Sequence, residues 1–291
     1  MIESALVTEP LISVVMCVRD GQRWLREAID SVLSSTVPLE LLVIDDASTD
    51  ETPRLLRAVQ SARVRVLTND TPLGPFASAN RGLEVASAPF IARLDADDVC
   101  VPGRFERQLH ELERRPALSL LGTACTRIDT EGRELGPQRV PTGPDVALRA
   151  TLEPPFVHSS VMWRATTGLR YAPELSIGGD FELWARALTR LEADNLDAPL
   201  VRYREWQGSL SARRRDAQMA MHDAVSWRFL STRWPELGAM LPQHRALRRW
   251  AAGEGPPPHE LIDALVSASG GARATLEAPL GTLGQPRVAS R

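Results

Sequence analysis

The segment Phe90-Ile91-Ala92-Arg93-Leu94-Asp95-Ala96-Asp97-Asp98 runs from apolar residues into three carboxylates, and the chain turns soon afterwards at Val101-Pro102-Gly103. A strand that ends in clustered acids places negative charge at the carboxyl edge of a sheet, where α/β proteins bind ligands. Carboxylates this close raise one another's pKa unless a cation lies among them. Hard oxygen ligands favour Mg²⁺ or Mn²⁺, whose coordination substrate phosphates usually complete. A solvated acidic turn is the alternative.

The segments before this one predict a sheet of parallel strands. Leu11–Val18 and Leu39–Ile44 are short apolar runs suited to buried strands, and between them apolar residues recur at helical spacing from Trp24 to Leu33. Such a β-α-β beginning implies a right-handed crossover. Val64–Leu67 reads as a third strand, which makes the acidic segment the fourth. The predicted fold class is α/β, with a Rossmann-like, mostly parallel central sheet flanked by helices.

The rest of the chain predicts further strands and then a change of character. We expect strands at Leu118–Thr126, Val157–Trp163 and Leu200–Tyr203, and a helix that carries Phe181–Leu188. After residue 210 the pattern is helical. The predicted domains are a catalytic domain, a C-terminal helical extension and a disordered tail, at residues 1–210, 211–275 and 276–291.

Composition limits the functional classes. The chain has 291 residues, 43% hydrophobic and 24% charged, with a formal charge of −3, which gives no overall signature for binding nucleic acid. Every basic side chain other than histidine is Arg, so lysine nucleophiles and Schiff bases are excluded. Cys17, Cys100 and Cys125 lie far apart without metal-ligand spacing, as expected for thiols in a reducing compartment.

No signal peptide and no apolar stretch of the roughly 20 residues that span a bilayer is visible. We therefore expect a cytoplasmic protein and leave open a peripheral position at the inner face of the membrane.

Five motifs in one order carry a family resemblance: Val14–Asp20, Asp45–Asp50, Ala92–Asp98, His158–Arg164 and Gly179–Trp184. Together they resemble the inverting family-2 glycosyltransferases of GT-A fold, over residues 11–210. A single DxD motif is weak, whereas linked motifs in the same order are specific. The resemblance implies an enzyme that moves a sugar from a nucleoside-diphosphate donor, with a UDP-sugar favoured, to a carbohydrate or lipid-linked acceptor with the help of Mn²⁺ or Mg²⁺.

The acidic residues receive their roles from that resemblance. Asp97 is the expected metal ligand and Asp95 the contact to the donor's ribose or sugar, while Asp98 is either a supporting residue or a helix cap. Asp46 is expected to read the nucleobase, and Asp45 to bond loop amides. Cation-assisted departure of a diphosphate fits this chemistry independently, because charge develops on the leaving group.

Three further residues are assigned to the nucleoside pocket. Cys17 and Arg19 lie at the edge of the first strand, and the Arg19 guanidinium takes the place of an aromatic ring that many relatives carry, so it can stack on the base. Asn80 faces the same region in similar proteins. A helix amide satisfied by backbone groups is the alternative for Asn80.

Inversion needs a general base that deprotonates the acceptor hydroxyl. Asp180, at the start of a helix, matches the family's base. The alternative for Asp180 is an N-cap, and Glu182 is the second candidate for the base.

Residues of two later segments complete the predicted site. His158 is assigned to the vicinity of the metal or acceptor, with a satisfied core histidine as the alternative. Arg204 is expected to pair with the diphosphate and Trp206 to stack on the acceptor sugar, with plain packing as the alternative for both.

Rival functions and the C-terminal part remain to be weighed. A non-catalytic nucleotide-sugar binder is one rival, and it requires Asp180 to face away from the cleft. A sugar nucleotidyltransferase is less well supported, because only Arg19-Asp20-Gly21 stands where its glycine- and arginine-rich loop belongs. A dinucleotide-dependent oxidoreductase is not supported, because no GxGxxG motif follows Val18.

The C-terminal helices can pack back on the catalytic domain or contact a second copy, a partner or a membrane surface. Arg213-Arg214-Arg215 reads as a solvated helix end.

Overall fold

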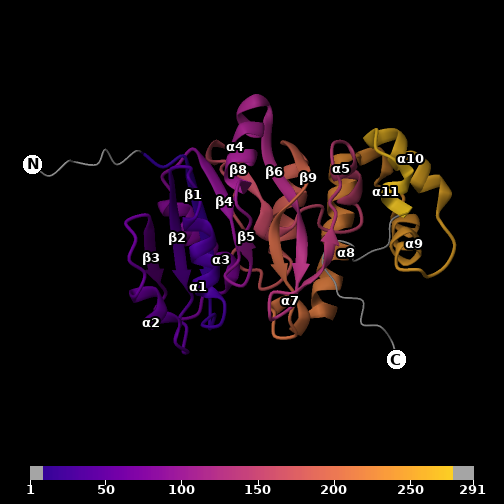
Figure 1. Ribbon diagram of the computed structural model, residues 1–291. Helices are drawn as coiled ribbons and strands as arrows, with labels where there is room; N and C mark the ends of the chain where they lie inside the picture. Colours follow the sequence, from indigo (N-terminus) through magenta and orange to yellow (C-terminus); the bar gives the residue numbers. More distant parts are fainter. Residues whose placement is uncertain (1–8, 278–291) are drawn as a thin grey trace, which may run out of the picture.

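The computed structural model describes residues 9–277, and its first part alternates strands and helices (Figure 1). β1 pairs in parallel with β2 and β4, and β2 pairs in parallel with β3. The core strands β1, β2 and β4 are apolar because both of their faces are buried. This confirms the predicted β-α-β beginning. The elements are β1 (Ile12–Val18), α1 (Leu25–Leu33), β2 (Leu39–Asp45), α2 (Thr52–Arg57), β3 (Val64–Thr68), α3 (Pro75–Val85) and β4 (Phe90–Arg93).

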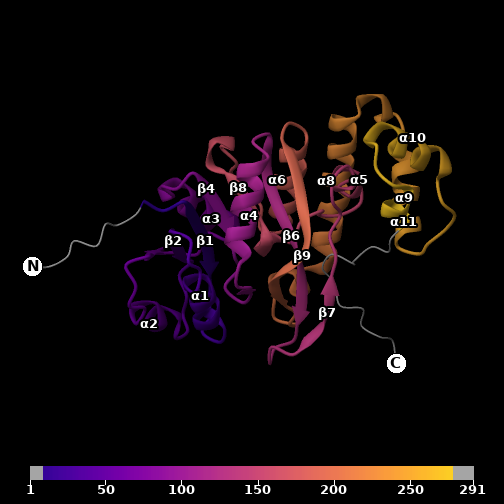
Figure 2. The same cartoon turned by 45° about the horizontal axis from the view of Figure 1, so that its top comes forward.

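The second part extends the same sheet with mixed strand directions. β8 lies antiparallel between β4 and β6, and β6 runs parallel to β9. The sheet order is β3-β2-β1-β4-β8-β6-β9-β5, and β7 forms a hairpin with β6 that projects from the sheet (Figure 2). The elements are β5 (Val99–Cys100), α4 (Arg104–Arg114), β6 (Leu118–Ile128), β7 (Glu134–Gln138), α5 (Asp145–Arg149), β8 (Met162–Arg164), α6 (Gly179–Leu188) and β9 (Glu192–Arg204).

The predicted strand over residues 157–163 is wrong in its first half. His158–Ser160 forms a 3-10 turn, η1, and only then does β8 begin; a second such turn, η2, covers Ala165–Thr167. The turn forms because the Ser160 amide and hydroxyl both donate to the carbonyl oxygen of Val157, at 2.9 and 2.8 Å. The turn points His158 and Ser159 toward the end of β4, where a strand would have carried them past it.

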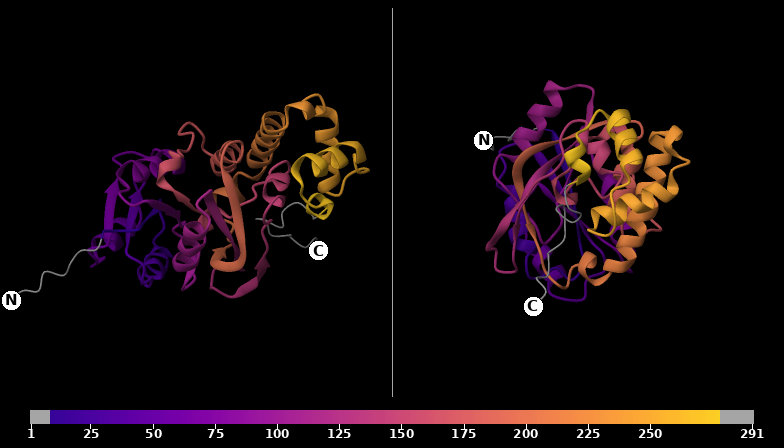
Figure 3. Two further views of the ribbon diagram at one scale, coloured as in Figure 1. Left: turned by 90° about the horizontal axis from the view of Figure 1, so that it is seen from above. Right: turned by 90° about the vertical axis from the view of Figure 1, so that its right-hand side faces the viewer.

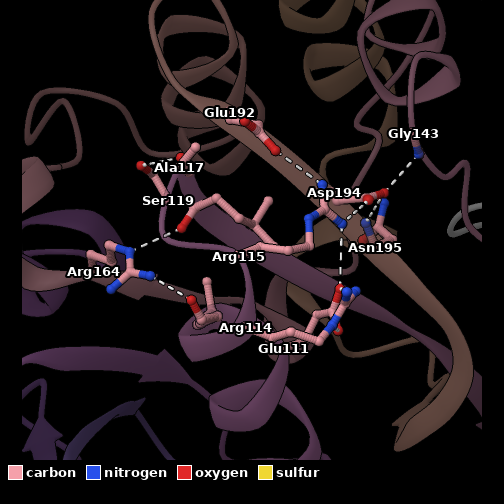
Figure 4. Close-up of polar contacts among 12 residues, drawn as sticks. Glu111, Arg114, Arg115, Ala117, Ser119, Gly143, Arg164, Glu192, Asp194 and Asn195 are labelled. Atoms are coloured by element: carbon pink, nitrogen blue, oxygen red, sulfur yellow. Dashed lines mark hydrogen bonds and ion pairs between the residues drawn. The ribbon is translucent and has the colours of Figure 1, made fainter.

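β9 is much longer than the predicted strand at residues 200–203. Its polar first half is held in place by Arg115 at the end of α4, which pairs with Asp194 at 2.7 Å and Glu192 at 3.0 Å (Figure 4). Asp194 also accepts a hydrogen bond of 2.7 Å from the Gly143 amide. The segment is held in the sheet by its pairing with β6, and these ion pairs satisfy its charged side chains; its own sequence pattern does not indicate a strand.

The C-terminal helices pack against the end of the sheet (Figure 3). Val225, Phe229 and Leu230 of α8 are buried in one cluster with Trp184 of α6 and Val146 of α5. This continuous core favours the helices packing back, and the domain boundary at residue 210 stays a prediction. The elements are α7 (Leu210–Arg213), α8 (Arg215–Arg233), η3 (Pro235–Leu237), α9 (Leu241–Ala251), α10 (His259–Ser269) and α11 (Arg273–Glu277).

The end of the described chain corrects one prediction. Leu276 lies in α11 and is fully buried, so the expected disorder does not begin at residue 276, and residues 278–291 of the predicted tail lie outside the described part. None of the helices within residues 9–277 has the length and apolarity needed to cross a membrane.

Candidate functional site

A cavity of 2340 Å³ opens at the carboxyl ends of β1, β2 and β4 and extends to α6 and α8. Sites for one small ligand usually measure about 300–1,000 Å³, so this cavity has room for two substrates. It brings together nine of the ten predicted site residues, from segments far apart in the chain: Cys17, Arg19, Asp46, Asp95, Asp97, His158, Asp180, Arg204 and Trp206.

Asp95 is an ionised carboxylate with fixed partners. One oxygen lies 2.9 Å from Nδ1 of His158, and the other accepts a hydrogen bond of 3.0 Å from the buried guanidinium of Arg93. Burial alone would raise the pKa of Asp95, but the charge and hydrogen bond of His158, together with the charge of Arg93, hold it well below its ordinary value. Asp95 is therefore pre-positioned at the end of β4.

Asp97 has the opposite electrostatic character. Its Oδ2 accepts a hydrogen bond of 2.8 Å from the indole N–H of Trp206, whose ring lies edge-on to Trp24 with centroids 5.0 Å apart. Burial and the negative charge of Asp95 raise the pKa of Asp97 to about 6. A carboxylate whose negative charge is destabilised in this way is well suited to a positive partner.

Asp98 supports the site from behind. It is 1% exposed, accepts a hydrogen bond from the Ser159 hydroxyl and another of 2.7 Å from the Arg204 amide, and its pKa is raised well above the usual value by burial and by Asp97. The helix that follows is capped by Gly103 without a side-chain bond. Of the two roles considered for Asp98, the structure favours the supporting one.

The contacts of Arg204 favour packing, the alternative to the predicted pairing with the diphosphate. Its guanidinium is 1% exposed and donates to the carbonyl oxygens of Asp97 and Asp129, at 2.8 and 3.0 Å, and to the Glu27 carboxylate at 2.7 Å. Because all three nitrogens already have partners inside the protein, the guanidinium holds the Asp97 loop in place. The sequence could not show this, since the three partners come from distant segments.

Asp46 is bound by the loop that follows β3. Its Oδ1 accepts hydrogen bonds from Asn69, the Leu73 amide and Ser78, at 2.6, 2.7 and 2.9 Å. Oδ2 accepts one hydrogen bond, of 2.9 Å from the Gly74 amide, and so has capacity for another at a residue that lines the cavity. These bonds outweigh burial and lower the pKa of Asp46. Asp45 bonds the Ser48 amide at 3.0 Å, as expected for a structural residue.

The loops after β1 and β2 hold each other in strained conformations. Asp20 and Ala47 have φ angles of 53° and 56°, in the left-handed region that side chains other than glycine rarely occupy. The Asp20 carboxylate accepts a hydrogen bond of 2.7 Å from the Thr49 amide, and the Asp20 amide donates to the Ser48 hydroxyl at 2.9 Å. The mutual bonds keep the edge of the cavity rigid.

The other nucleoside-pocket residues differ in exposure. Arg19 is half exposed at the cavity, and within residues 9–277 its guanidinium has a single ion-pair contact, of 3.9 Å with Asp20, so it can reorient. Burial raises the pKa of Cys17, which makes it a neutral wall residue. Asn80 uses both ends of its amide, each at 2.9 Å, to clamp the backbone of Tyr171, and within the described chain it does not line the cavity. The structure thus favours the satisfied helix amide for Asn80.

Two residues that contact the site, Tyr171 and Ser159, were not predicted from the sequence. Tyr171 accepts or donates a hydrogen bond of 2.9 Å at Nε2 of His158, so that His158 lies between Tyr171 and Asp95. Ser159 also accepts a hydrogen bond of 3.0 Å from the Asp95 amide. Only the position of Ser159 next to His158 could have pointed to its role, because neither residue type is distinctive.

Asp180 lines the cavity at the start of α6. It is the second residue of the helix, whose cap position belongs to Gly178 at φ 68°, so Asp180 does not take the N-cap role. Within residues 9–277 its carboxylate has no hydrogen-bond partner. Asp180 lies in the first turn of α6, at the positive end of the helix dipole.

The residues present fit a divalent cation. Within residues 9–277 no group of three or more His, Cys, Asp and Glu side chains could hold a metal alone. Asp97 nevertheless offers a hard oxygen whose negative charge burial and Asp95 disfavour. This suits Mg²⁺ or Mn²⁺, which commonly take one or two carboxylates and complete their shell with substrate phosphates and water.

Comparisons with known proteins agree with this geometry. Residues 13–165 match the model of glycosyl transferase family 2. The putative glycosyltransferase EpsE of Bacillus subtilis is 33% identical over 206 residues, covering 67% of this chain and 73% of EpsE. The succinoglycan biosynthesis protein ExoO of Rhizobium meliloti is 29% identical over 198 residues, covering 62% of this chain and 56% of ExoO.

Solved structures show the same fold. S. aureus TarS 1–349 in complex with UDP-GlcNAc superposes with a TM-score of 0.59 at 15% identity, covering 89% of this chain and 81% of that one. The mannosyltransferase PcManGT from Pyrobaculum calidifontis, in complex with GDP-Man and Mn²⁺, gives 0.58 at 15% identity, covering 92% and 85%. Fold and site together define a glycosyltransferase of GT-A fold. The chain belongs to glycosyl transferase family 2.

Proposed function

We propose that this enzyme is an inverting, metal-assisted glycosyltransferase that moves a sugar from a nucleoside-diphosphate sugar to an acceptor hydroxyl, with Asp180 as the general base. The observation that carries the proposal is that a single cavity is lined by both the Asp95–Asp97 acid pair and Asp180. Its volume of 2340 Å³ accommodates a donor and an acceptor together.

The donor binds at the ends of β1, β2 and β4. Asp46 keeps a lone pair for a base N–H, Cys17 walls the pocket, and the half-exposed Arg19 guanidinium stacks on the base. TarS and PcManGT were solved with UDP-GlcNAc and GDP-Man, which supports a nucleotide-sugar donor. Among these donors we favour a UDP-sugar.

The acid pair handles the donor's sugar and diphosphate. Asp95, fixed by Arg93 and His158, accepts hydrogen bonds from the donor's ribose or sugar hydroxyls. A Mg²⁺ or Mn²⁺ ion held by Asp97 would stabilise the charge on the departing diphosphate. Trp206 fixes the Asp97 carboxylate through its indole N–H, and its ring presents an apolar face to an acceptor sugar.

Asp180 takes the acceptor's proton. Its carboxylate lies in the first turn of α6 and is not engaged elsewhere in the described chain, so it can accept the proton of a hydroxyl that attacks the anomeric carbon opposite the leaving group. That Asp180 lines the cavity also disfavours the rival of a non-catalytic nucleotide-sugar binder, which required the carboxylate to face away.

The product class follows from the relatives. ExoO is named for succinoglycan biosynthesis, which supports a role in bacterial surface polysaccharide or glycolipid synthesis.

The free thiols Cys17, Cys100 and Cys125 fit a reducing compartment, so we place the reaction in the cytoplasm, with the C-terminal helices available for the inner face of the membrane.

The test is donor turnover. The purified chain is incubated with UDP-, GDP- and dTDP-sugars and Mn²⁺, with release of nucleoside diphosphate measured and the anomeric configuration of the freed or transferred sugar read by NMR before mutarotation. We expect one donor class to be consumed with inversion. Retention of configuration would exclude the inverting mechanism, and a chain that binds no nucleotide sugar in the presence of Mn²⁺ would contradict the proposed function.

A further inference from the structure

Two glycines, Gly178 and Gly179, stand directly before the proposed base Asp180, and the proposed function has not used them. Asp180 belongs to α6, which together with α8 forms a helix wall along the cavity; Figure 2 shows the two helices side by side. The rings of Phe181 and His222 join these helices, with centroids 5.2 Å apart. The backbone of the two glycines therefore determines where the Asp180 carboxylate stands in the cavity.

Gly179 lies against the ring of Phe76. A Cβ atom at Gly179 would lie 2.6, 2.7 and 2.9 Å from three ring carbons of Phe76, whereas non-bonded carbon atoms pack at about 3.5–4.0 Å. Gly179 is the first residue of α6 and does not have a positive φ angle, so its backbone conformation does not require glycine. The glycine is required for space, because the ring occupies the place of a side chain.

The Phe76 ring is itself held in place. It stacks on Tyr171, with centroids 5.4 Å apart and an angle of 22° between the planes. Asn80, four residues after Phe76 on the same face of α3, clamps the backbone of Tyr171, and the Tyr171 hydroxyl is bonded to His158. Because Phe76 is 6% exposed and packed in this way, its ring cannot easily move aside for a neighbouring side chain.

Gly178 meets the other side of the turn. Its φ angle is 68°, and a Cβ atom there would lie 2.6 Å from Cγ and 3.3 Å from Cβ of Met221 in α8. The turn before Asp180 thus passes between Phe76 of α3 and Met221 of α8. It is packed from both sides, so an added methyl group must displace either the turn or the Phe76 ring.

We propose that Phe76 is a positioning residue for Asp180: its ring, packed against Gly179, sets the distance between the base and the donor site. α3 begins beside Gly74, whose amide binds Asp46 in the proposed nucleoside pocket, so one helix start contacts both the donor site and the turn of the base. The inference rests on the proposed function, because it takes Asp180 as the base. A misplacement of about 1 Å can lower the rate of a reaction about 100-fold.

The experiment compares wild type with Gly179→Ala, Phe76→Val and the two substitutions together. Alanine adds the methyl group that meets the ring, and valine lacks the three ring carbons that the methyl group would meet. Crystal structures measure the position of the Asp180 carboxylate without need of an acceptor. Calorimetry measures nucleotide affinity, and turnover is measured as nucleoside diphosphate release with Mn²⁺, the donor that binds, and water or methyl glycosides as acceptors.

We expect Gly179→Ala to displace the Asp180 carboxylate by about 1 Å, because contacts of 2.6 Å must widen to about 3.5 Å. Turnover should fall about 10- to 100-fold, with nucleotide affinity unchanged. In the double variant the carboxylate should return to within about 0.5 Å of its wild-type position, and most of the lost turnover should return with it. Phe76→Val alone should lower turnover less than Gly179→Ala.

Two outcomes overturn the inference. In one, Gly179→Ala shifts the Phe76 ring and leaves the Asp180 carboxylate in place, as expected if Phe76 only fills space. In the other, the carboxylate of the double variant is displaced as far as that of Gly179→Ala.

Gly238→Ala is the matched control. Gly238 also has an ordinary φ angle, of −63°, and a Cβ atom there would meet no atom closer than 3.0 Å. Within the described part of the chain it does not line the cavity, so the carboxylate and turnover should match wild type. Failure of the proposed function is a different result: the wild-type protein then binds no nucleotide sugar, or Asp180→Asn keeps full turnover.

Discussion

The two sides of the cavity differ in how firmly their polar side chains are held. On the strand side, Asp46 accepts four hydrogen bonds, and Asp95 is fixed between Arg93 and His158. On the helix side, Asp180 and the arginines Arg213 and Arg215 have no side-chain partner within residues 9–277. In the proposed function, the firmly held side chains bind the nucleotide sugar, and the groups without partners on the other side of the cavity meet the second substrate.

This difference suggests that the two sides of the cavity contribute to different steps of the reaction. Groups held before binding lose little conformational freedom when the donor arrives, so the strand side should determine donor affinity. Groups that gain their partners only from the acceptor should act on turnover. Substitutions on the two sides should therefore separate binding from catalysis.

The largest effect is expected on the helix side, from Asp180→Asn. The amide cannot accept the hydroxyl proton, so turnover should fall about 10²- to 10⁴-fold, while nucleotide binding stays the same. Initial rates of nucleoside diphosphate release, with calorimetry of nucleotide binding, measure the two quantities separately.

Glu182→Gln is the matched control for Asp180→Asn. Glu182 lies on the same helix and pairs with Arg186 at 3.0 Å, so its removal should change turnover only slightly. If Glu182→Gln lost turnover and Asp180→Asn kept it, the base would be Glu182.

The next effect is expected on the strand side, from Asp46→Ala. Four donors lose a charged acceptor, at about 1 kcal/mol each, so the free energy of unfolding should fall by about 4 kcal/mol. Nucleotide affinity should fall with it, because the loop over residues 69–74 loses its anchor. Urea unfolding and nucleotide titration test this, with exposed Asp70→Ala as a control that should match wild type. Unchanged stability of Asp46→Ala would show that the strand side is less rigid than its bonds indicate.

A smaller effect, on the pH dependence of stability, is expected from His244 of α9, which packs against Ser226 of α8. Burial lowers the pKa of His244 to about 4, from an ordinary 6.5, despite a 3.1 Å hydrogen bond to the Thr151 carbonyl. As the pH falls, the unfolded chain therefore binds a proton at His244 before the folded chain does. The free energy of unfolding is unaffected by His244 above about pH 6.5 and decreases between about pH 6.5 and pH 4, by about 3 kcal/mol in total.

The comparison of His244→Gln with wild type checks this effect. The glutamine can still donate to Thr151 but does not titrate, so the variant's free energy of unfolding should depend less on pH between 6.5 and 4. Parallel curves for the two proteins would show that His244 is not buried neutral, and that the helix wall is looser than described.

The strand side was largely predictable from sequence. Parallel buried strands bring their carboxyl ends to one edge, so Cys17, Asp46 and Asp97 could be placed together from pattern alone. The sequence predicted which residues line the cavity, but it did not predict the hydrogen-bond and ion-pair partners of these residues. Arg204 is the clearest case. From the sequence, an arginine that binds a substrate diphosphate cannot be told from one that holds the Asp97 loop in place from inside the protein.

The helix side was less predictable for physical reasons. The polar first half of β9 is a strand because it pairs with β6, with Arg115 bound to Asp194 beside it, and the turn at His158 depends on bonds from Ser160. That Arg215 and His222 face the cavity depends on how α8 packs against α6, which helical spacing alone does not fix. The sequence indicated a solvated helix end at residues 213–215; these arginines are exposed, as predicted, and tertiary packing also places them along the cavity.

The most direct test of the central claim is a thermal-shift panel of UDP-, GDP- and dTDP-sugars with and without Mn²⁺, on wild type, Asp97→Ala and Asp180→Asn. We predict that one donor class raises the melting temperature of wild type only with Mn²⁺, that Asp97→Ala loses this shift, and that Asp180→Asn keeps it. A wild-type protein that no nucleotide sugar stabilises, or an Asp97→Ala variant with the full metal-dependent shift, would contradict the account.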